Sequence, residues 1–267
     1  FYGHILALGM EHMVDFTDLD PKAPEKFLRK LRAAGAGVIG LAHPFCIGRP
    51  VTAGCRMDLE IHDWNQIDYI EVFNTSGGTE AMAGKIMGNR RALEFWEEKV
   101  LEGYHLSAVS GKDIHQKPQK LPVMITYALL EDDAEEDMED AAKAVLGALM
   151  RQKTVVTKGP MLHAWAEQDN LWIEVEHSSE YEKWNEKWKN CNPVLWIRGR
   201  HVEKALPLYF TKCVEKIKLP GILHEEQETD QYGYHTMVLR LYDGTCQYEN
   251  LLAAGISVRW KSGGKEE

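Results

Sequence analysis

The chain repeatedly places polar residues directly behind short apolar runs, and this arrangement constrains its fold more than any other feature. Residues 38–42 form a continuous apolar run that ends at His43, and residues 67–73 form a second run. A third run, residues 105–110, precedes the polar segment 111–115. Runs that are apolar throughout are typical of parallel strands covered on both faces. The sequence therefore predicts a parallel sheet or barrel whose strands end in polar groups.

Segments with helical character separate these runs. Residues 18–34 and 79–101 carry apolar side chains at the spacing of an amphipathic helix. Residues 131–152 begin with acidic side chains, which suit the positive end of a helix dipole. Further apolar runs at residues 1–9 and 122–128 extend the pattern. Strands that alternate with helices imply right-handed crossovers, so we expect an α/β architecture in this part of the chain.

The pattern changes after about residue 158. Turns with Asn and Gly become more frequent, and segments such as 171–175, 194–197 and 236–241 alternate between apolar and polar residues. Such alternation is typical of antiparallel strands with one face in water. We therefore predict two domains, a β/α domain over residues 1–158 and a smaller, mostly-β domain over residues 159–267.

Composition narrows the class of protein. The 267 residues carry a formal net charge of −10, which disfavours a nucleic-acid partner. No apolar run is long enough to span a membrane, and no leader with a basic and then an apolar part opens the sequence. The five cysteines are odd in number and none forms a Cys-x-x-Cys pair. Reduced thiols in the cytoplasm are therefore expected.

Four residues at the ends of three successive predicted strands suit a metal site: His43, Glu71, Asp113 and His115. Parallel barrels place catalytic groups on the rim where strands end. Imidazole and carboxylate suit Zn, Mn or Fe, and two close ions activate a bridging water toward an ester. Each residue also has an ordinary explanation, because a His before Pro is often structural and Asp-x-His pairs arise by chance. A carboxylate within an apolar strand, however, requires a partner or a metal.

Taken in order, these motifs resemble a known superfamily. They are Gly-His at residues 3–4, Ala-His-Pro at 42–44, Ile-Glu-Val-Phe-Asn at 70–74 and Gly-x-Asp-x-His at 111–115. The set is similar to the PHP (polymerase and histidinol phosphatase) superfamily of metal-dependent phosphoesterases, in its CehA/McbA-like branch. The resemblance covers roughly residues 1–160. It implies a partial, distorted (β/α)7 barrel with two or three divalent metal ions.

The same resemblance implies roles for individual residues. The implied metal ligands are His4, His43, Asp113 and His115. Glu71 is implied as a further ligand and catalytic residue, and Lys112, where the family carries a small residue, would bind a substrate anion or point to solvent. Family members also carry a His-x-His strand and further ligands before the position of His4, and none precedes it here. We therefore expect an earlier natural start, and an open barrel edge covered by a homodimer or by a separate segment.

Two functions are compatible with these observations. The first is a hydrolase of phosphoester or related ester bonds in a small-molecule substrate, which uses a metal-activated water. The alternative is a non-catalytic, degenerate module whose C-terminal β domain binds a partner or glycan. Tyr181, Trp184 and Trp188 lie at helical spacing and would suit such a partner, although packing within their own domain is the ordinary explanation.

Overall fold

The computed structural model describes residues 2–48, 55–74, 88–114, 124–130, 138–176, 190–210, 214–261 and 265–266. His115, Tyr181, Trp184 and Trp188 lie outside these residues. The chain separates into two compact units. The first comprises Phe1–Trp96, Tyr104–Val123 and Ala128–Thr154, and the second comprises Glu97–Gly103, Met124–Tyr127 and Val155–Glu267.

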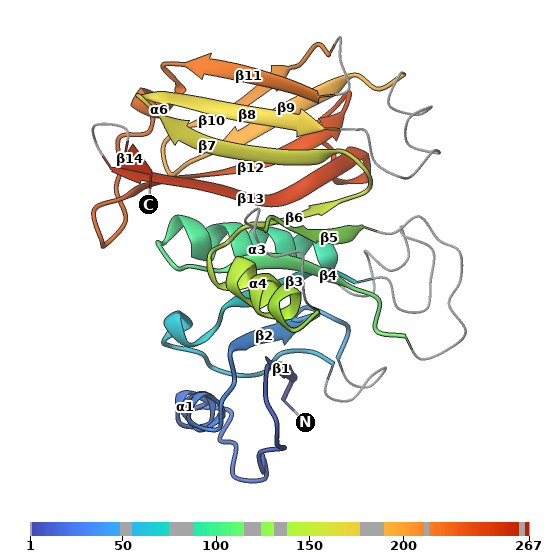
Figure 1. Ribbon diagram of the computed structural model, residues 1–267, viewed down its shortest axis with the longest axis vertical. Coiled ribbons are helices and arrows are strands. Elements are labelled where there is room, and N and C mark those ends of the chain that lie inside the picture. Colours follow the sequence, from blue (N-terminus) through green and yellow to red (C-terminus); the bar gives the residue numbers. More distant parts are fainter. Residues whose placement is uncertain are drawn as a thin grey trace. The chain divides into compact units, whose positions relative to one another are not determined.

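The first unit is built on one four-stranded sheet. Its described elements are β1 (His4–Leu8), α1 (Glu25–Ala33), β2 (Val38–Ala42), the short 3-10 helix η1 (Trp64–Gln66), β3 (Tyr69–Asn74), α3 (Asn89–Leu101), β4 (Ser107–Gly111) and α4 (Met138–Met150). The strands follow the order β1-β2-β3-β4 (Figure 1). Strands β2, β3 and β4 run parallel, as predicted, whereas β1 is antiparallel to β2. None of the helices in the described ranges has the length and apolar character needed to cross a bilayer.

Close packing of β2 on β3 depends on a glycine. A Cβ added at Gly40 would lie 2.1 Å from the Tyr69 ring, so only glycine leaves room for this tyrosine in the neighbouring strand. Tyr69 is buried in a small core with Val38 of β2 and Leu149 of helix α4. The helix therefore covers the strands that carry the candidate site residues.

The predicted partial (β/α)7 barrel is wrong. The described strands β1 to β4 form an open, mixed sheet, and β5 (Ile125–Ala128) pairs with β6 (Thr154–Thr157) in a different sheet. A barrel would need an unbroken ring of tilted strands. The apolar runs identified the strands but not their directions, because burial on both faces does not depend on the direction of the chain. The connection between β1 and β2 includes α1, so it is long enough to let β2 run in either direction relative to β1.

The second unit is a two-layered antiparallel structure. Its elements are β5 (Ile125–Ala128), β6 (Thr154–Thr157), β7 (Met161–Glu167), β8 (Asn170–Glu176), β9 (Pro193–Arg198), β10 (Glu203–Pro207), β11 (Val214–Pro220), α6 (Ile222–Glu225), β12 (His235–Asp243), the 3-10 helix η2 (Tyr248–Asn250), β13 (Leu251–Lys261) and β14 (Lys265–Glu266). One sheet has the order β10-β9-β12-β13-β6-β5, with β14 on β13, and the other has the order β11-β8-β7 (Figure 1).

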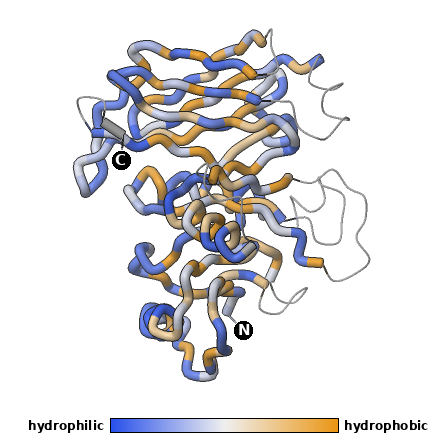
Figure 2. Tube along the Cα trace, in the orientation of Figure 1, coloured by the Kyte–Doolittle hydropathy of each residue, from blue (hydrophilic) through white to orange (hydrophobic). Residues whose placement is uncertain are grey.

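A continuous apolar core lies between these two sheets. It includes Leu162 and Ile173 of the three-stranded sheet, together with Leu195, Leu239 and Val258 of the larger sheet. Strands β7 and β8 bury every second residue, and Figure 2 shows the matching alternation of hydrophobic and hydrophilic residues along the strands of this unit. The intervening residues of the three-stranded sheet therefore face outward.

One ion pair is buried within the second unit. Glu97 has no exposed surface, and both its carboxylate oxygens accept hydrogen bonds from the Arg240 guanidinium. The same guanidinium donates to the Tyr242 hydroxyl and lies 4.6 Å from the centre of the Trp196 ring. Arg198 approaches the Glu97 carboxylate to 3.8 Å. Because a buried charge needs such partners, this network holds the end of α3 from Glu97 onward, which belongs to the second unit, against β12.

Candidate functional site

Polar side chains from three distant segments meet in the first unit. The His4 Nδ1 atom lies 3.1 Å from the His43 Nε2 atom. The same His43 nitrogen lies 3.9 Å from the Asp113 Oδ2 atom. His4 opens β1 opposite Ala42, the last residue of β2, so the antiparallel pairing is what brings the two imidazoles together. We call His4, His43 and Asp113 the histidine–aspartate cluster.

A backbone carbonyl orients the central imidazole of this cluster. The His43 Nδ1 atom lies 3.2 Å from the carbonyl oxygen of Cys55. Since a carbonyl only accepts hydrogen bonds, the contact assigns a proton to Nδ1, so in the neutral imidazole the lone pair lies on Nε2. That nitrogen faces His4 and Asp113, and the residue is only 3% exposed. A hydrogen bond of this kind on the outer nitrogen is characteristic of metal-ligating histidines.

The backbone is strained at two members of the cluster. His43 has φ of 32° and Asp113 has φ of 46°, both in the left-handed region that non-glycine residues rarely adopt. The other described non-glycine residues with positive φ are the turn residues Gln152, Gln168 and Asp169. Strained conformations persist only where surrounding contacts hold them, and they concentrate at functional sites.

Glu71 is the contact that holds the strained turn. Its Oε2 atom accepts the backbone N–H of His43 at 2.8 Å, and its Oε1 atom accepts the Asn74 amide at 2.7 Å. A Cβ at Gly111 would lie 2.1 Å from Oε1, so β4 must carry a glycine there. Burial raises the pKa of Glu71, and the Asn74 hydrogen bond and the nearby His43 offset this only in part. These contacts make Glu71 a positioning residue, and its predicted metal-binding and catalytic roles stay predictions.

Two predicted site residues remain, and three groups at the site were not predicted from the sequence. Lys112 is exposed, and its predicted contact with a substrate anion stays a prediction. His115 lies outside the described residues. Sequence reasoning assigned no role to Asn74 or Gly111, although Asn74 closes one of the quoted motifs and Gly111 opens another. The Cys55 carbonyl gave no signal, because a backbone acceptor twelve residues from His43 leaves no mark on side-chain chemistry.

The donor types and spacing of the cluster fit part of a metal coordination shell. Two nitrogen ligands at tetrahedral Zn, each about 2.0–2.1 Å from the ion, lie about 3.3 Å apart. The 3.1 Å and 3.9 Å separations lie on either side of that value. Within the described ranges, however, no three or more His, Cys, Asp or Glu side chains are arranged so that they could hold an ion. The cluster therefore fits a partial site that needs a movement of Asp113 or a further ligand.

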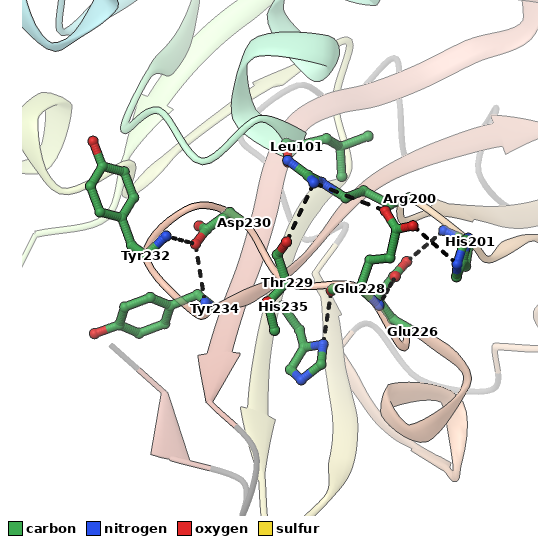
Figure 3. Close-up of polar contacts among 10 residues, drawn as sticks. All are labelled: Leu101, Arg200, His201, Glu226, Glu228, Thr229, Asp230, Tyr232, Tyr234 and His235. Carbon is green, nitrogen blue, oxygen red and sulfur yellow. Dashed lines mark hydrogen bonds and ion pairs between the residues drawn. The ribbon is translucent and has the colours of Figure 1, made fainter.

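A second polar cluster, in the second unit, is structural (Figure 3). The buried Glu226 carboxylate accepts the backbone N–H groups of His201 and Glu228, both at 3.0 Å. The His201 and Glu228 side chains form a pair at 3.2 Å, and each is about half exposed. Arg200 donates from Nε to the Leu101 carbonyl at 2.7 Å. Because backbone donors occupy both Glu226 oxygens, this carboxylate orders the turn after β9 and offers little to an ion.

Comparison with known proteins adds no assignment. The sequence matches no family model, and no curated protein is significantly similar to it.

Proposed function

We propose that the chain is a metal-dependent hydrolase of phosphoester or related ester bonds, and that His4, His43 and Asp113 contribute to its metal site. The observation that carries the proposal is the orientation of His43. Its Nδ1 proton is directed at a backbone carbonyl, and its Nε2 lone pair is directed at a second imidazole and a carboxylate. Such an arrangement gathers two imidazole nitrogens and a carboxylate oxygen around one point.

Each residue has a separate task in this proposal. His4 and His43 supply nitrogen donors, and Asp113 supplies negative charge; this donor set suits Zn, Mn or Fe. Glu71 keeps the His43 backbone in its strained conformation by accepting its N–H. A divalent ion held by these residues would lower the pKa of a bound water and polarise an ester oxygen. The resemblance to PHP phosphoesterases supports the proposal through these residues and not through a barrel.

Location and assembly follow as parts of the same proposal. No disulfide is formed by the described cysteines Cys46, Cys55, Cys191 and Cys246, and reduced thiols support a cytoplasmic location. Strand β1 stands at one end of the four-stranded sheet, and a second copy of the chain in a homodimer would cover such an edge.

Metal analysis of the full chain tests the proposal. The purified protein is loaded with Mn²⁺, Fe²⁺ or Zn²⁺, desalted, and assayed for bound metal and for hydrolysis of phosphomonoesters and phosphodiesters. Asp113→Asn is the informative variant, because asparagine tolerates the left-handed backbone but lacks the charge. His62→Ala is the matched control, since His62 is exposed and its described hydrogen bond is made by the backbone.

The expected result is loss of metal and turnover together. Asp113→Asn should weaken metal binding by about tenfold or more, as for other altered metal-site contacts, while His62→Ala matches the unmodified chain. Full metal content and activity in Asp113→Asn would show that the assignment is wrong. Absence of stoichiometric metal in the unmodified protein would favour the alternative of a non-catalytic binding module.

A further inference from the structure

The outward face of the three-stranded sheet carries an aromatic row, formed by His163, Trp165 and Trp172. Trp165 on β7 and Trp172 on β8 are direct cross-strand partners. Their rings are nearly parallel, at 7°, with centres 6.2 Å apart. The His163 ring continues the row, with its centre 5.0 Å from that of Trp165. These residues alternate with the buried positions of β7 and β8, so the core does not account for them.

Two lysines from the neighbouring strand lie against this row. The Lys216 ammonium is 4.4 Å from the centre of the Trp165 ring and 4.9 Å from that of Trp172. The Lys218 ammonium is 5.7 Å from the Trp172 ring. Both lysines occupy exposed positions of β11, while the two indoles are half-buried. The face thus combines two parallel indoles with two lysine ammonium groups, and Glu174, the cross-strand partner of Lys216, adds one carboxylate beside them.

We propose that this face binds an acidic carbohydrate, one whose sugar rings carry carboxylate or sulfate groups. The proposal is independent of the hydrolase assignment. Indole faces are electron-rich and flat, so they suit the C–H groups on one side of a sugar ring. The lysine ammonium groups match the negative charge of such a ligand. Both parts of the ligand therefore find a partner on the same face.

The position of Lys216 explains why the sugar should be acidic. Its ammonium rests over both indoles, so any sugar that stacks there must displace it. A neutral sugar would remove that cation–π contact and would offer the displaced ammonium no ion pair in exchange. An acidic sugar re-pairs the displaced ammonium with its own charge. A single-stranded nucleic acid would also stack on indoles, but its backbone is usually held by a basic groove that follows the strand, and this face carries two lysines beside the carboxylate of Glu174.

Binding titrations of the full chain test this assignment. The probes are polygalacturonate for carboxylate, heparin for sulfate, a soluble neutral β-glucan, and a single-stranded oligonucleotide. Trp172→Ala removes part of the aromatic row, and Lys216→Gln removes the cation while keeping a polar side chain of similar length. Trp196→Ala is the control for loss of an indole elsewhere, because Trp196 lies on β9 in the other sheet, where its ring packs against Arg240. Thermal unfolding of each variant establishes that it is folded.

The unmodified chain should bind at least one acidic polysaccharide, with affinity that falls as salt rises. Trp172→Ala should lose about tenfold in affinity or more, and Lys216→Gln should lose about tenfold for the acidic probes only. Trp196→Ala should bind as the unmodified chain does. Lack of binding to both acidic probes, tighter binding of the neutral glucan or the oligonucleotide, or an equal loss in Trp196→Ala overturns the proposal. If Trp172→Ala does not fold, Lys216→Glu at its exposed position decides, since it must abolish acidic binding.

Discussion

Replacement of Gly111 by alanine should disrupt the histidine–aspartate cluster without touching any of its members. The added Cβ would lie 2.1 Å from the Glu71 Oε1 atom, whereas an ordinary contact begins at 3.4 Å. The carboxylate must therefore move by more than about 1 Å, too far to keep both its hydrogen bonds. Gly111 does not have a left-handed backbone, so alanine meets no conformational strain of its own.

The expected cost follows from the contacts that are lost. Forcing a methyl group into a filled site costs about 1–3 kcal/mol, and leaving the buried His43 N–H without its acceptor costs about 1–3 kcal/mol more. Some relaxation is certain, because Glu71 has a flexible side chain, so we expect a loss of about 3 kcal/mol. The freed His43 turn should also weaken metal binding by about tenfold to a hundredfold.

Urea denaturation at pH 7 with a chelator present measures the stability change, and metal titration measures the second effect. Gly37→Ala is the matched control. Its Cβ would meet the Leu8 carbonyl oxygen at 3.6 Å and the Leu146 side chain at 3.7 Å, both ordinary contacts. That variant should be neutral or up to about 1 kcal/mol more stable. If Gly111→Ala unfolds at the same urea concentration as Gly37→Ala, the role assigned to Glu71 is wrong.

Two further predictions concern stability elsewhere in the chain. Arg240→Met should destabilise the second unit by about 3–5 kcal/mol, because it leaves the Glu97 carboxylate buried without its main partner. The double variant Glu97→Leu with Arg240→Met should recover most of that loss in chemical denaturation, and no recovery would argue against a desolvation penalty. The hydrogen bond from the Gln66 side chain lowers the pKa of Asp63 below its usual 3.8, so this carboxylate stabilises the fold above that pH and ceases to do so as the pH falls through the lowered value. The stability difference between the unmodified chain and Asp63→Ala should therefore be constant near neutrality and shrink below pH 3.8, measured by thermal unfolding across pH.

Part of this structure was predictable from local chemistry. The run at residues 38–42 becomes β2 with the expected bounds, because an uninterrupted apolar stretch of that length fits a covered strand. The meeting of His43 and Asp113 was also predictable, since parallel β2 and β4 end on the same side of the sheet. His4 was placed in the site by resemblance to a family with a barrel. It reaches the site through an antiparallel pairing that the motif does not reveal.

Other features depend on contacts that a sequence does not record. The direction of β1 is set by how the chain returns after Leu8, and apolar periodicity carries no information about that return. The aromatic row also arises only after pairing. Trp165 and Trp172 are separated in the chain by a tight turn, and Lys216 joins them from a strand more than forty residues later. The alternation of apolar and polar residues in β11, which carries Lys216, does not indicate that β11 pairs with β8.

Because His4 lies on β1, a ligand of the histidine–aspartate cluster should affect how readily β1 separates from β2. β1 is paired with β2 on one side and leaves several of its residues exposed or half-exposed. A slip of one residue against β2 would turn His4 to the opposite face of the sheet. An ion bound between His4 and His43 would therefore stabilise the pairing of β1 with β2 in its present register. Its amide hydrogens should exchange with solvent more slowly in metal than in chelator, and the slowing should measure the binding free energy.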